Sequence, residues 1–503
     1  MKRVERLIVA LDLGSSGVKA AAATPNGRPL SVCRLPAPVV RPPGGSELAR
    51  EFDIPLLRRT VGRALAACLR EAGGSPSKVA GIGVTSQREA IVLLDRAGVP
   101  LYAGPNNDLR AAFQGAAIDD AHATAIWNAT GHLPSFMLAW SKLLWFREEA
   151  PDLYRRATHV TSLADWLIFE LTGELKLERS LGVEAGLVEV DTGRRATRLA
   201  ARLGFEEVGV PDIVAAGQVI GLTRPARDTW HRLPAGVPVV NAGPDTQAAL
   251  LGMGVIDPGQ TGIVAGWSGV VQRVTSQSVR DPARGLWTGR HAAPDRFTVE
   301  GNAGVMGGAY QWLVGLTCGS DSAAFAKADR LAMGTPRSAG SVSAHLGPAA
   351  VNMSRSSLRT GGFIFPVPLA LETPGAGHLC RAAIENFGFA FRSNLEMIDS
   401  LLGHAPAGAY AAVGGGMVRS KAFRRVLTDV LPAGVRFGHP DSSLLGAISQ
   451  VAVASGHTSL TSAAVARRRA CRQLAPDAAA VREYDQLYAE WRHRGDILAQ
   501  IGL

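Results

Sequence analysis

The sequence predicts an α/β protein built from two large lobes. At 503 residues the chain is longer than one hydrophobic core usually organises. Short apolar runs typical of buried strands alternate with longer segments of helical spacing, which is the pattern of α/β domains. A short motif near the start also recurs after about 250 residues, and such an echo indicates two related halves. We expect the lobes to span residues 1–254 and 255–503.

Composition narrows the classes of function. The chain has 47% hydrophobic and 19% charged residues and lacks an apolar run long enough for a bilayer, so we expect no disorder and no membrane partner. Asp12 interrupts the first apolar run without a cleavage site after it, and the five scattered cysteines form no Cys-x-x-Cys pair. These features favour a reducing cytoplasm. The net charge of +10 is dispersed among few aromatic residues, which argues against nucleic acid and favours anionic ligands.

The first unit, residues 7–30, reads as three strands joined by two turns. Its first turn is Gly14-Ser15-Ser16-Gly17, whose small residues let backbone N–H groups approach a phosphate while the hydroxyls add donors. Asp12 at the strand end could hold a hydrated Mg²⁺, and Lys19 on the return strand could reach a terminal phosphate. A plain Gly-Ser hairpin in a sheet is the alternative.

The echo lies in the second half. Ile8-Val9-Ala10 followed by Ser16-Gly17-Val18 recurs as Ile263-Val264-Ala265 followed by Ser268-Gly269-Val270. The second copy has a shorter turn, no acidic residue there, and Trp267 instead. Two related lobes that each open with a hairpin explain this pattern, although chance similarity of small and β-branched residues would also produce it.

Two polar clusters each follow an apolar strand. Gln87-Arg88-Glu89 comes after the buried-strand pattern of residues 79–84, and Asn107-Asp108-Leu109-Arg110 comes after the strand predicted at residues 91–95. Carboxylates and amides exchange hydrogen bonds with sugar hydroxyls, and arginine orients a ligand through two donors. The clusters therefore suit a ligand rich in hydroxyl groups, with salt-bridged turns as the alternative.

A single carboxylate stands at a strand-to-helix corner in residues 239–250. An apolar run meets the break Gly243-Pro244, and Asp245 precedes an Ala/Leu-rich segment. In open α/β sheets ligands collect beyond the carboxyl ends of the strands, so an acid there can face a substrate. An aspartate that caps the following helix is the structural alternative.

The remaining pattern completes an α/β chain. A strand at residues 411–413 meets Gly414-Gly415-Gly416, which opens a helix through residue 431 and offers backbone to a flat base or a phosphate. Residues 361–368 read as a buried apolar segment. Further helices are predicted over residues 52–72, 141–149, 162–171, 300–313 and 381–402.

In this order the segments resemble the FGGY carbohydrate kinases, the two-lobed ATP-dependent kinases of the actin, sugar kinase and Hsp70 superfamily. The resemblance covers almost the whole chain and implies two ribonuclease H-like lobes, each a mixed β-sheet flanked by helices, with an ATP cleft between them. The motifs that carry it are Asp12-Leu13-Gly14-Ser15-Ser16-Gly17-Val18-Lys19, Gln87-Arg88-Glu89, Asn107-Asp108-Leu109-Arg110, Ala164-Asp165-Trp166-Leu167, Leu171-Thr172-Gly173-Glu174, Gly243-Pro244-Asp245, Glu300-Gly301, Gln311-Trp312-Leu313, Arg381-Ala382-Ala383-Ile384-Glu385 and Val413-Gly414-Gly415-Gly416.

The resemblance also implies a role for each matching position. Asp12 would organise Mg²⁺, and Asp245 would be the general base that accepts the alcohol proton as the alcohol attacks the γ-phosphate. The acceptor hydroxyls would bind Gln87, Arg88, Glu89 and Asp108. The ATP side would be lined by Gly14, Ser15, Ser16 and Lys19 at the phosphates, by Ser268 as a candidate second phosphate contact, and by Gly415, Gly416 and Ser420 near the adenosine.

The chain departs from the family pattern in places that bear on the substrate. Trp267 stands where the family has a Gly-Thr pair, and Asn106 replaces a tryptophan on the sugar-facing wall. The segment after Pro366 is shorter than in the family, which removes a loop near the cleft or a subunit contact. The resemblance allows a homodimer. Gln-Arg-Glu is similar to the glycerol kinase version of the first cluster, and Asn-Asp-x-Arg to the xylulose kinase version of the second.

We therefore expect a glycerol-like polyol or a ketopentose-like sugar as the acceptor. The alternative is an acceptor-independent two-lobed ATPase, or a kinase homologue that only senses a sugar. Retention of Asp12, Lys19 and Asp245 favours an active kinase over both.

Overall fold

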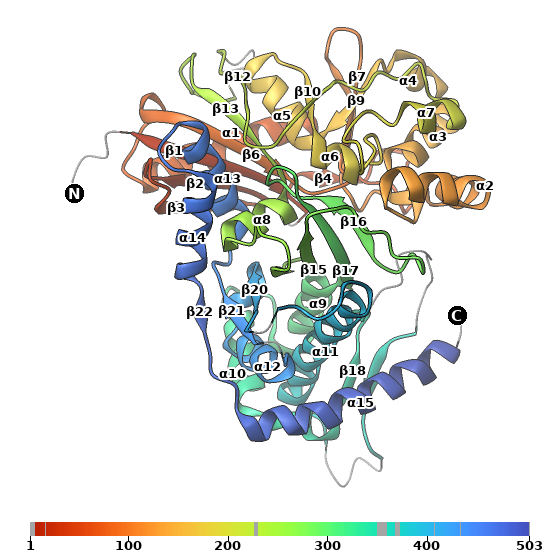
Figure 1. Cartoon of the computed structure of the whole chain (residues 1–503), viewed down its shortest axis with the longest axis vertical. Helices are drawn as coiled ribbons and strands as arrows, with labels where there is room; N and C mark the ends of the chain where they lie inside the picture. The colour runs from red at the N-terminus through yellow and green to blue at the C-terminus, as the bar shows by residue number, and fades with distance from the viewer. Residues whose placement is uncertain are drawn as a thin grey trace.

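Two β-sheets define two lobes in the computed structural model (Figure 1), which describes residues 6–15, 17–225, 230–349, 360–367, 373–406, 408–432 and 434–501. The N-terminal lobe is built on a six-stranded sheet in the order β12-β13-β6-β1-β2-β3. Strands β1, β6 and β13 run parallel and the other pairs are antiparallel. The strands are β1 (Leu7–Gly14), β2 (Gly17–Ala23), β3 (Pro29–Leu35), β6 (Val79–Ser86), β12 (Val219–Leu222) and β13 (Pro238–Pro244).

The C-terminal lobe repeats this arrangement in a seven-stranded sheet of order β16-β17-β15-β14-β20-β21-β22. Its hairpin β14–β15 stands in the place of β1–β2, and β14, β20 and β21 run parallel as β1, β6 and β13 do. This confirms the predicted α/β fold with mixed sheets. The strands are β14 (Thr261–Ala265), β15 (Ser268–Thr275), β16 (Trp287–Arg290), β17 (Phe297–Val305), β20 (Ala411–Gly414), β21 (Val435–Phe437) and β22 (Arg472–Gln473).

A smaller subdomain of short strands and helices extends the N-terminal lobe on the right of Figure 1. A three-stranded sheet, β8-β7-β9, packs with helices around its own aromatic core, which includes Trp127, Trp140 and Phe146. The elements are β7 (Ile91–Leu94), β8 (Pro100–Gly104), β9 (His159–Ser162), β10 (Lys176–Glu178), β11 (Asp212–Val214), α2 (Ala112–Thr130), α3 (Ala139–Glu149), α4 (Pro151–Arg156), α6 (Arg179–Glu184) and α7 (Thr197–Leu203).

Helices cover both faces of the N-terminal sheet. Helices α1 (Ile54–Glu71) and α5 (Leu163–Thr172) share one core with it. On the other face lies α13 (Ser442–Ala454), whose Leu444 and Ile448 pack against Ile8 and Val240. A helix from the end of the chain therefore completes the first lobe and ties the two halves together.

Helix α13 crosses α8 (Asp245–Met253) between the sheets at very short range (Figure 1). A Cβ atom at Gly446 would lie 1.8 Å from the Ala248 carbonyl oxygen, and one at Gly252 would lie 1.9 Å from that of Ser442. Only glycine permits this backbone contact. The crossing fixes the start of α8, and with it Asp245.

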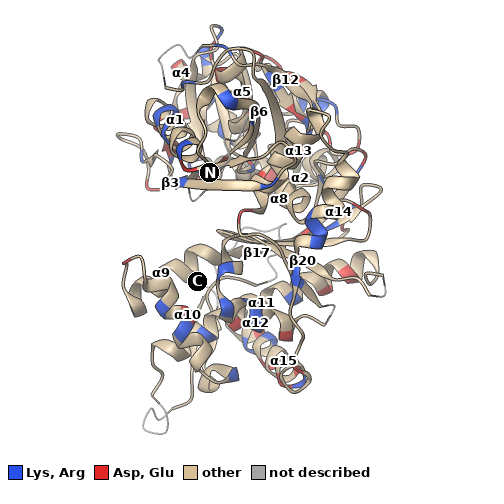
Figure 2. Ribbon diagram, turned by 90° about the vertical axis from the view of Figure 1, so that its left-hand side faces the viewer, with Lys and Arg blue, Asp and Glu red and all other residues tan. Residues whose placement is uncertain are grey.

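The C-terminal lobe carries its own core between its sheet and the helices α9 (Met306–Cys318), α10 (Ala324–Gly334), α11 (Ala376–Leu402), α12 (Lys421–Val430) and α15 (Ala478–Gln500). Helix α14 (Leu460–Ala470) packs against α8 and α13. In the view of Figure 2, Lys and Arg positions are scattered over both lobes. Of the helices in the described ranges, none is long and apolar enough to cross a membrane.

Two predicted elements differ from the structure. The helix predicted over residues 300–313 is wrong in its first half, because residues up to Val305 belong to β17 and α9 begins at Met306. The Gly- and Ala-rich stretch has weak local preference, and pairing with β15 and β16 decides its state. Of residues 361–368, the described part is not buried: β19 (Gly362–Ile364) pairs only with β18 (Ser343–His345), and Val367 is 76% exposed.

The helix crossing yields a test of the packing. We expect Gly446→Ala to destabilise the protein by about 1–3 kcal/mol, since the obstructing atoms are backbone and cannot turn aside. Gly315→Ala in α9 is the matched control, because nothing lies within 4 Å of its added Cβ atom; it should be neutral or stabilising by up to about 1 kcal/mol. Equal melting temperatures for the two variants in calorimetry would contradict the tight crossing.

Candidate active site

The β1–β2 hairpin brings Asp12 and Lys19 together within the N-terminal sheet. They are directly paired across β1 and β2, and Lys19 Nζ lies 3.0 Å from Asp12 Oδ2. The Ser443 hydroxyl on α13 donates to the same oxygen at 2.7 Å. Burial alone would lower the pKa of Lys19, but the charges of Asp12, Asp245 and Asp441 raise it overall. Lys19 therefore stays protonated and positively charged beside the turn.

The turn itself links two predicted groups. Ser15 Oγ donates to Gln87 Oε1 at 3.3 Å and lies 3.2 Å from Asn106 Oδ1. Gly14 ends β1, and Ser16 lies outside the described residues. The structure thus places this turn next to Gln87 and Asn106, with the Ser15 hydroxyl hydrogen-bonded within the protein.

Asp245 is the first residue of α8 and not its cap. Pro244 holds the cap position, and no side chain makes a capping hydrogen bond there, so the helix-cap alternative is wrong. The Asp245 carboxylate accepts one hydrogen bond, from Thr246 Oγ1 at 3.2 Å. Burial raises the pKa of Asp245 to about 7, and the charge of Asp12 adds to this, while Arg88 and Lys19 oppose it. The carboxyl group is therefore poised near neutral pH.

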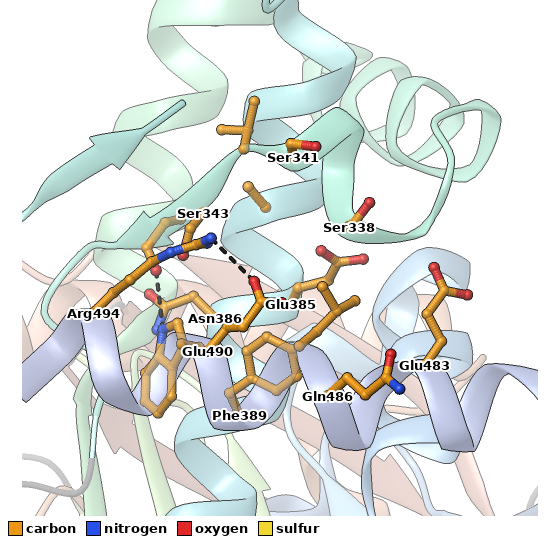
Figure 3. Close-up of a pocket in the computed structure, with 15 residues that line it drawn as sticks. Ser338, Ser341, Ser343, Glu385, Asn386, Phe389, Glu483, Gln486, Glu490 and Arg494 are labelled. Carbon is orange, nitrogen blue, oxygen red and sulfur yellow. Dashed lines mark hydrogen bonds and ion pairs between the residues drawn. The ribbon is translucent and has the colours of Figure 1, made fainter. Parts of the chain in front are cut away.

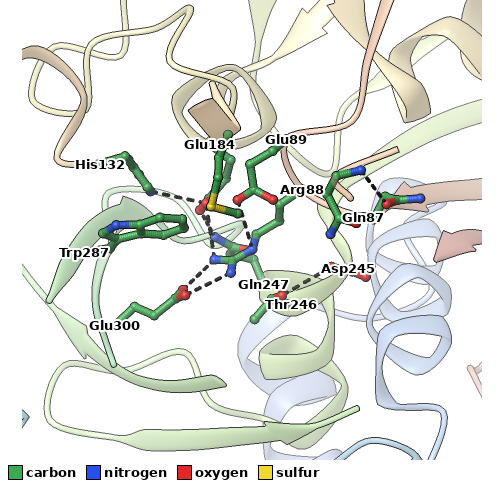
Figure 4. A network of polar contacts seen from close by, with 12 residues as sticks. Gln87, Arg88, Glu89, His132, Glu184, Asp245, Thr246, Gln247, Trp287 and Glu300 are labelled. Carbon is green, nitrogen blue, oxygen red and sulfur yellow. Dashed lines mark hydrogen bonds and ion pairs between the residues drawn. The ribbon is translucent and has the colours of Figure 1, made fainter. Parts of the chain in front are cut away.

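Gln87, Arg88 and Glu89 follow β6 and are all buried. Arg88 donates to both carboxylate oxygens of Glu300, at 2.5 and 2.9 Å, and to Glu184 at 3.3 Å (Figure 4). Its guanidinium also lies 5.6 Å from the ring centroid of Trp287. Arg88 is the centre of an ionic network that joins the two lobes.

Glu89 differs from its neighbour because one of its oxygens is unused. Its backbone has a positive φ of 56°, which is uncommon for a non-glycine residue. Burial raises the pKa of Glu89, and the charges of Glu184 and Glu300 raise it further against the opposing charge of Arg88. Its unpaired oxygen can hydrogen-bond a hydroxyl group of a ligand.

Asp108 is placed differently from the other acceptor candidates. Its carboxylate accepts from Tyr102 at 2.5 Å, from Arg110 at 2.7 Å and from the Arg50 backbone at 2.9 Å. Three protein donors therefore already bind this carboxylate and hold it in place. Fully buried Lys142 lies behind it and donates to the Met137 carbonyl at 3.2 Å. Burial lowers the pKa of Lys142, while the charges of Asp108 and Glu89 raise it in part.

The nucleotide-side candidates meet where β14 and β20 end. Gly415 has φ of 96°, and a Cβ atom there would lie 2.5 Å from the Ala265 carbonyl oxygen, so backbone passes close to backbone. Gly416 follows it, and Ser420 caps α12 while donating to Asp329 at 2.5 Å. Ser268 begins β15 next to Trp267, whose indole is 40% exposed and packs on Gly308.

Sequence reasoning missed most of the network around Arg88. Glu184 accepts from Gln247 Nε2 at 2.6 Å and lies 3.3 Å from His132 Nε2, and the His132 and Trp287 rings meet edge to face (Figure 4). Gln247 stands two residues after Asp245, which could have suggested it. The residues Glu184, His132 and Trp287 stand in no motif, because distant segments bring them together.

Four buried polar atoms gather around the start of α8 without a hydrogen-bond partner among the described residues: Asp12 Oδ1, Gln87 Nε2, Glu89 Oε1 and Gln247 Oε1. Buried polar groups are nearly always paired, so these four atoms make the start of α8 the candidate ligand site. The described residues contain no group of three or more His, Cys, Asp or Glu side chains arranged as a metal site. Mg²⁺ often takes one or two carboxylates with phosphate oxygens and water, which Asp12 and its unpaired oxygen fit.

A separate cavity of about 320 Å³ lies in the C-terminal lobe between α11, α15 and residues 338–344 (Figure 3). Its buried polar groups are satisfied within the protein. Glu385 accepts from Arg381 at 2.8 Å and from Tyr484 at 2.9 Å, and Asn386 donates to the Pro348 carbonyl at 2.8 Å. We therefore place the chemistry at the start of α8 and not in this cavity.

Each of the two lobes opens with a hairpin, and buried acidic residues lie with Lys19 and a glycine turn where β1 and β6 end, which fits a two-lobed sugar kinase. Sequence models of the family bear this out: the N-terminal domain of the FGGY family of carbohydrate kinases matches residues 7–252, and its C-terminal domain matches residues 262–455. The chain belongs to this family and is an ATP-dependent carbohydrate kinase.

Individual relatives agree with the family. The chain is 26% identical over 443 residues to autoinducer-2 kinase from Escherichia coli strain K12, covering 84% of this chain and 81% of that protein. Its fold matches xylulose kinase from Rhodospirillum rubrum with a TM-score of 0.80 at 24% identity, over 99% of both chains. It matches Plasmodium falciparum glycerol kinase with ADP equally well, with a TM-score of 0.80 at 16% identity over 98% of both.

The buried network predicts a large stability effect of Arg88→Ala. Removing the guanidinium leaves Glu184 and Glu300 buried without it, which costs about 3–5 kcal/mol. In the wild type, burial raises the pKa of Glu184 but Arg88 and His132 lower it further, to below its usual 4.5, so the ion pair stabilises above that pH and is lost as pH falls. In the variant, burial raises that pKa instead.

Melting curves at pH 8 and pH 5 test this expectation. The difference in melting temperature between the wild type and Arg88→Ala should be smaller at pH 5 than at pH 8, because the buried carboxyl groups of the variant bind protons at pH 5. Arg155→Ala is the control, because its ion pair with Asp152 on α4 is exposed and should contribute little to stability. A melting-temperature difference that does not change with pH would contradict the stabilising role of the buried ion pairs.

Proposed function

We propose that the enzyme transfers the γ-phosphate of ATP to a hydroxyl of a small neutral polyol or ketose, of glycerol-like to ketopentose-like size, with Asp245 as the general base. The observation that carries this proposal is the set of unpaired buried polar atoms at the start of α8. Family membership supplies the reaction class, and these atoms supply the kind of acceptor.

The unpaired atoms at the site are mostly acceptors, so they suit a ligand that mainly donates hydrogen bonds. Glu89 Oε1 and Gln247 Oε1 are unused acceptors, Asp245 has spare acceptor capacity, and Gln87 Nε2 is an unused donor. Neighbouring hydroxyls on a short carbon chain provide this mixture.

Charge argues for a neutral acceptor. The carboxyl groups of Asp245, Glu89, Glu184 and Glu300 surround the site and outnumber the cations Arg88, Lys19 and Lys142 that act on them. A carboxylate on the substrate would add repulsion in a region of low dielectric, so acids of the same carbon skeleton should be poor acceptors.

The ATP side follows the wall that ends in Lys19. We propose that Lys19 and the backbone of Gly14, Ser15 and Ser16 hold the terminal phosphates, with the amide of Ser268 from the second hairpin. Gly415, Gly416 and Ser420 would border the adenosine, where the backbone is open. Mg²⁺, held through Asp12, would screen the phosphate charges.

In the reaction, one Asp245 oxygen accepts the alcohol proton as the alcohol oxygen bonds to the γ-phosphorus. The bond from that phosphorus to the bridging oxygen of ADP breaks, and ADP leaves with the electron pair. A base with a pKa of about 7 suits this transfer, because it is substantially deprotonated at neutral pH and still a competent acceptor.

Trp267 favours a second candidate, an ATPase without an acceptor or a sugar-sensing homologue. It places an exposed indole in the second phosphate turn, where a hydroxyl donor would strengthen phosphate binding. Turnover without an acceptor separates this candidate from the kinase.

An ADP-release assay tests the proposed function. The panel contains glycerol, xylitol, ribitol, D-xylulose, D-ribulose and autoinducer-2, the compound named for the Escherichia coli relative, with glycerate, xylonate and ribonate as charged controls. We expect turnover with at least one neutral compound and little with its matched acid. Dominant turnover without any acceptor would establish the second candidate instead.

Asp245→Asn tests the base with little change of shape. We expect turnover to fall by a factor of about 10² to 10⁴ while ATP binding, measured by calorimetry, persists. The wild-type kcat/KM should rise with pH through about 7, as Asp245 loses its proton, and the variant should lack this step. Near-normal turnover of the variant on the same acceptor would remove Asp245 from the mechanism.

Three expectations from the sequence stay predictions: the lobe boundary after residue 254, a cytoplasmic location and a homodimer. Light scattering on the purified chain decides the last.

A further inference from the structure

Glu300 lies in the C-terminal lobe but points at the acceptor-binding residues of the N-terminal lobe (Figure 4). It sits in the middle of β17, directly across from Gln272 on β15 and from Trp287 on β16. Cross-strand partners share one face of a sheet, so these three side chains form a small wall. Gln272 Nε2 donates to Glu300 Oε2 at 2.6 Å and fixes the carboxylate.

This carboxylate competes with Glu89 for Arg88. The guanidinium gives its two terminal nitrogens to Glu300, at 2.5 and 2.9 Å, whereas its Nε lies 3.7 Å from Glu89 Oε1, which is beyond hydrogen-bond range. Side-chain exposure is 8% for Arg88 and 3% for Glu300, so solvent screens the pair little. The same Glu89 oxygen is one of the unpaired atoms at the site.

We infer that Glu300 is a positioning residue for the phosphoryl acceptor: it holds Arg88 from the opposite lobe and so keeps the Glu89 carboxylate free to bind a substrate hydroxyl. Without the charge of Glu300, Arg88 would be left with Glu184 and Glu89. It would turn toward them and occupy the oxygen that the acceptor needs. The acceptor site is therefore complete only when both lobes contribute.

This inference rests on the proposed function, and the two fail separately. The probes are glycerol, xylitol and D-xylulose with the wild type. If the wild type phosphorylates none of them and none of the wider panel, both ideas fall. If it phosphorylates one, that compound becomes the probe for the variants.

Glu300→Gln keeps the shape of the side chain and removes its charge. We expect the KM for the acceptor to rise about 10- to 100-fold, the loss typical of a hydrogen bond to a charged group, with the KM for ATP unchanged. Glu300→Asp, which keeps the charge on a shorter stem, should fall between. Asp191→Asn is the control, because it breaks the bidentate lobe-to-lobe pair with Arg280 away from this wall and should change neither KM.

A double-mutant cycle with Glu89→Gln separates positioning from general structural damage. If Glu300 acts through Glu89, adding Glu300→Gln to Glu89→Gln should raise the acceptor KM little further. Additive effects, equal losses for acceptor and ATP, or an unchanged acceptor KM in Glu300→Gln would each overturn the inference. A melting curve of each variant confirms that folded protein is compared.

Discussion

The buried guanidinium of Arg88 is the constraint on which the site depends. It compensates carboxylates from both lobes, Glu184 on α6 and Glu300 on β17, in a place where unpaired charges would be prohibitive. Because these partners come from different lobes, the ion pairs fix the lobes against each other as well as the residues of the site. The cluster Gln87-Arg88-Glu89 is therefore also part of the interface between the lobes.

The carboxyl groups around Arg88 outnumber the cations, and this imbalance affects their pKa values. Burial raises the pKa values of Asp245 and Glu89, and neighbouring carboxylates raise them further, because Arg88 and Lys19 are not enough to neutralise them all. A carboxyl group that titrates near neutral pH can accept a proton from an alcohol and release it afterwards. The same excess of negative charge underlies the proposal of a neutral acceptor.

Local sequence was sufficient for elements whose signal is contiguous. The hairpin at Gly14–Gly17, the strand before Gln87 and the corner at Asp245 each combine an apolar run with a break, and the structure has all three. The network partners of Arg88 gave no such signal, since His132, Glu184 and Trp287 meet only through tertiary folding. Glu300 was even assigned to a helix, because its small neighbours carry little preference and strand pairing decided the outcome. Asp108 shows the reverse limit: its motif was visible, but not the three donors that occupy it.

The position of Asp245 depends finally on a backbone contact far from any polar group. Helix α8 carries Asp245 at its first residue and meets α13 where Gly446 and Gly252 allow carbonyl oxygens to approach. Helix α13 in turn supplies Ser443, which holds Asp12, and packs on the sheet that carries Lys19. A shift of one helix against the other would move Asp245 relative to Asp12 and Lys19 together. The glycines at this crossing therefore belong to the design of the active site as much as the carboxylate they position.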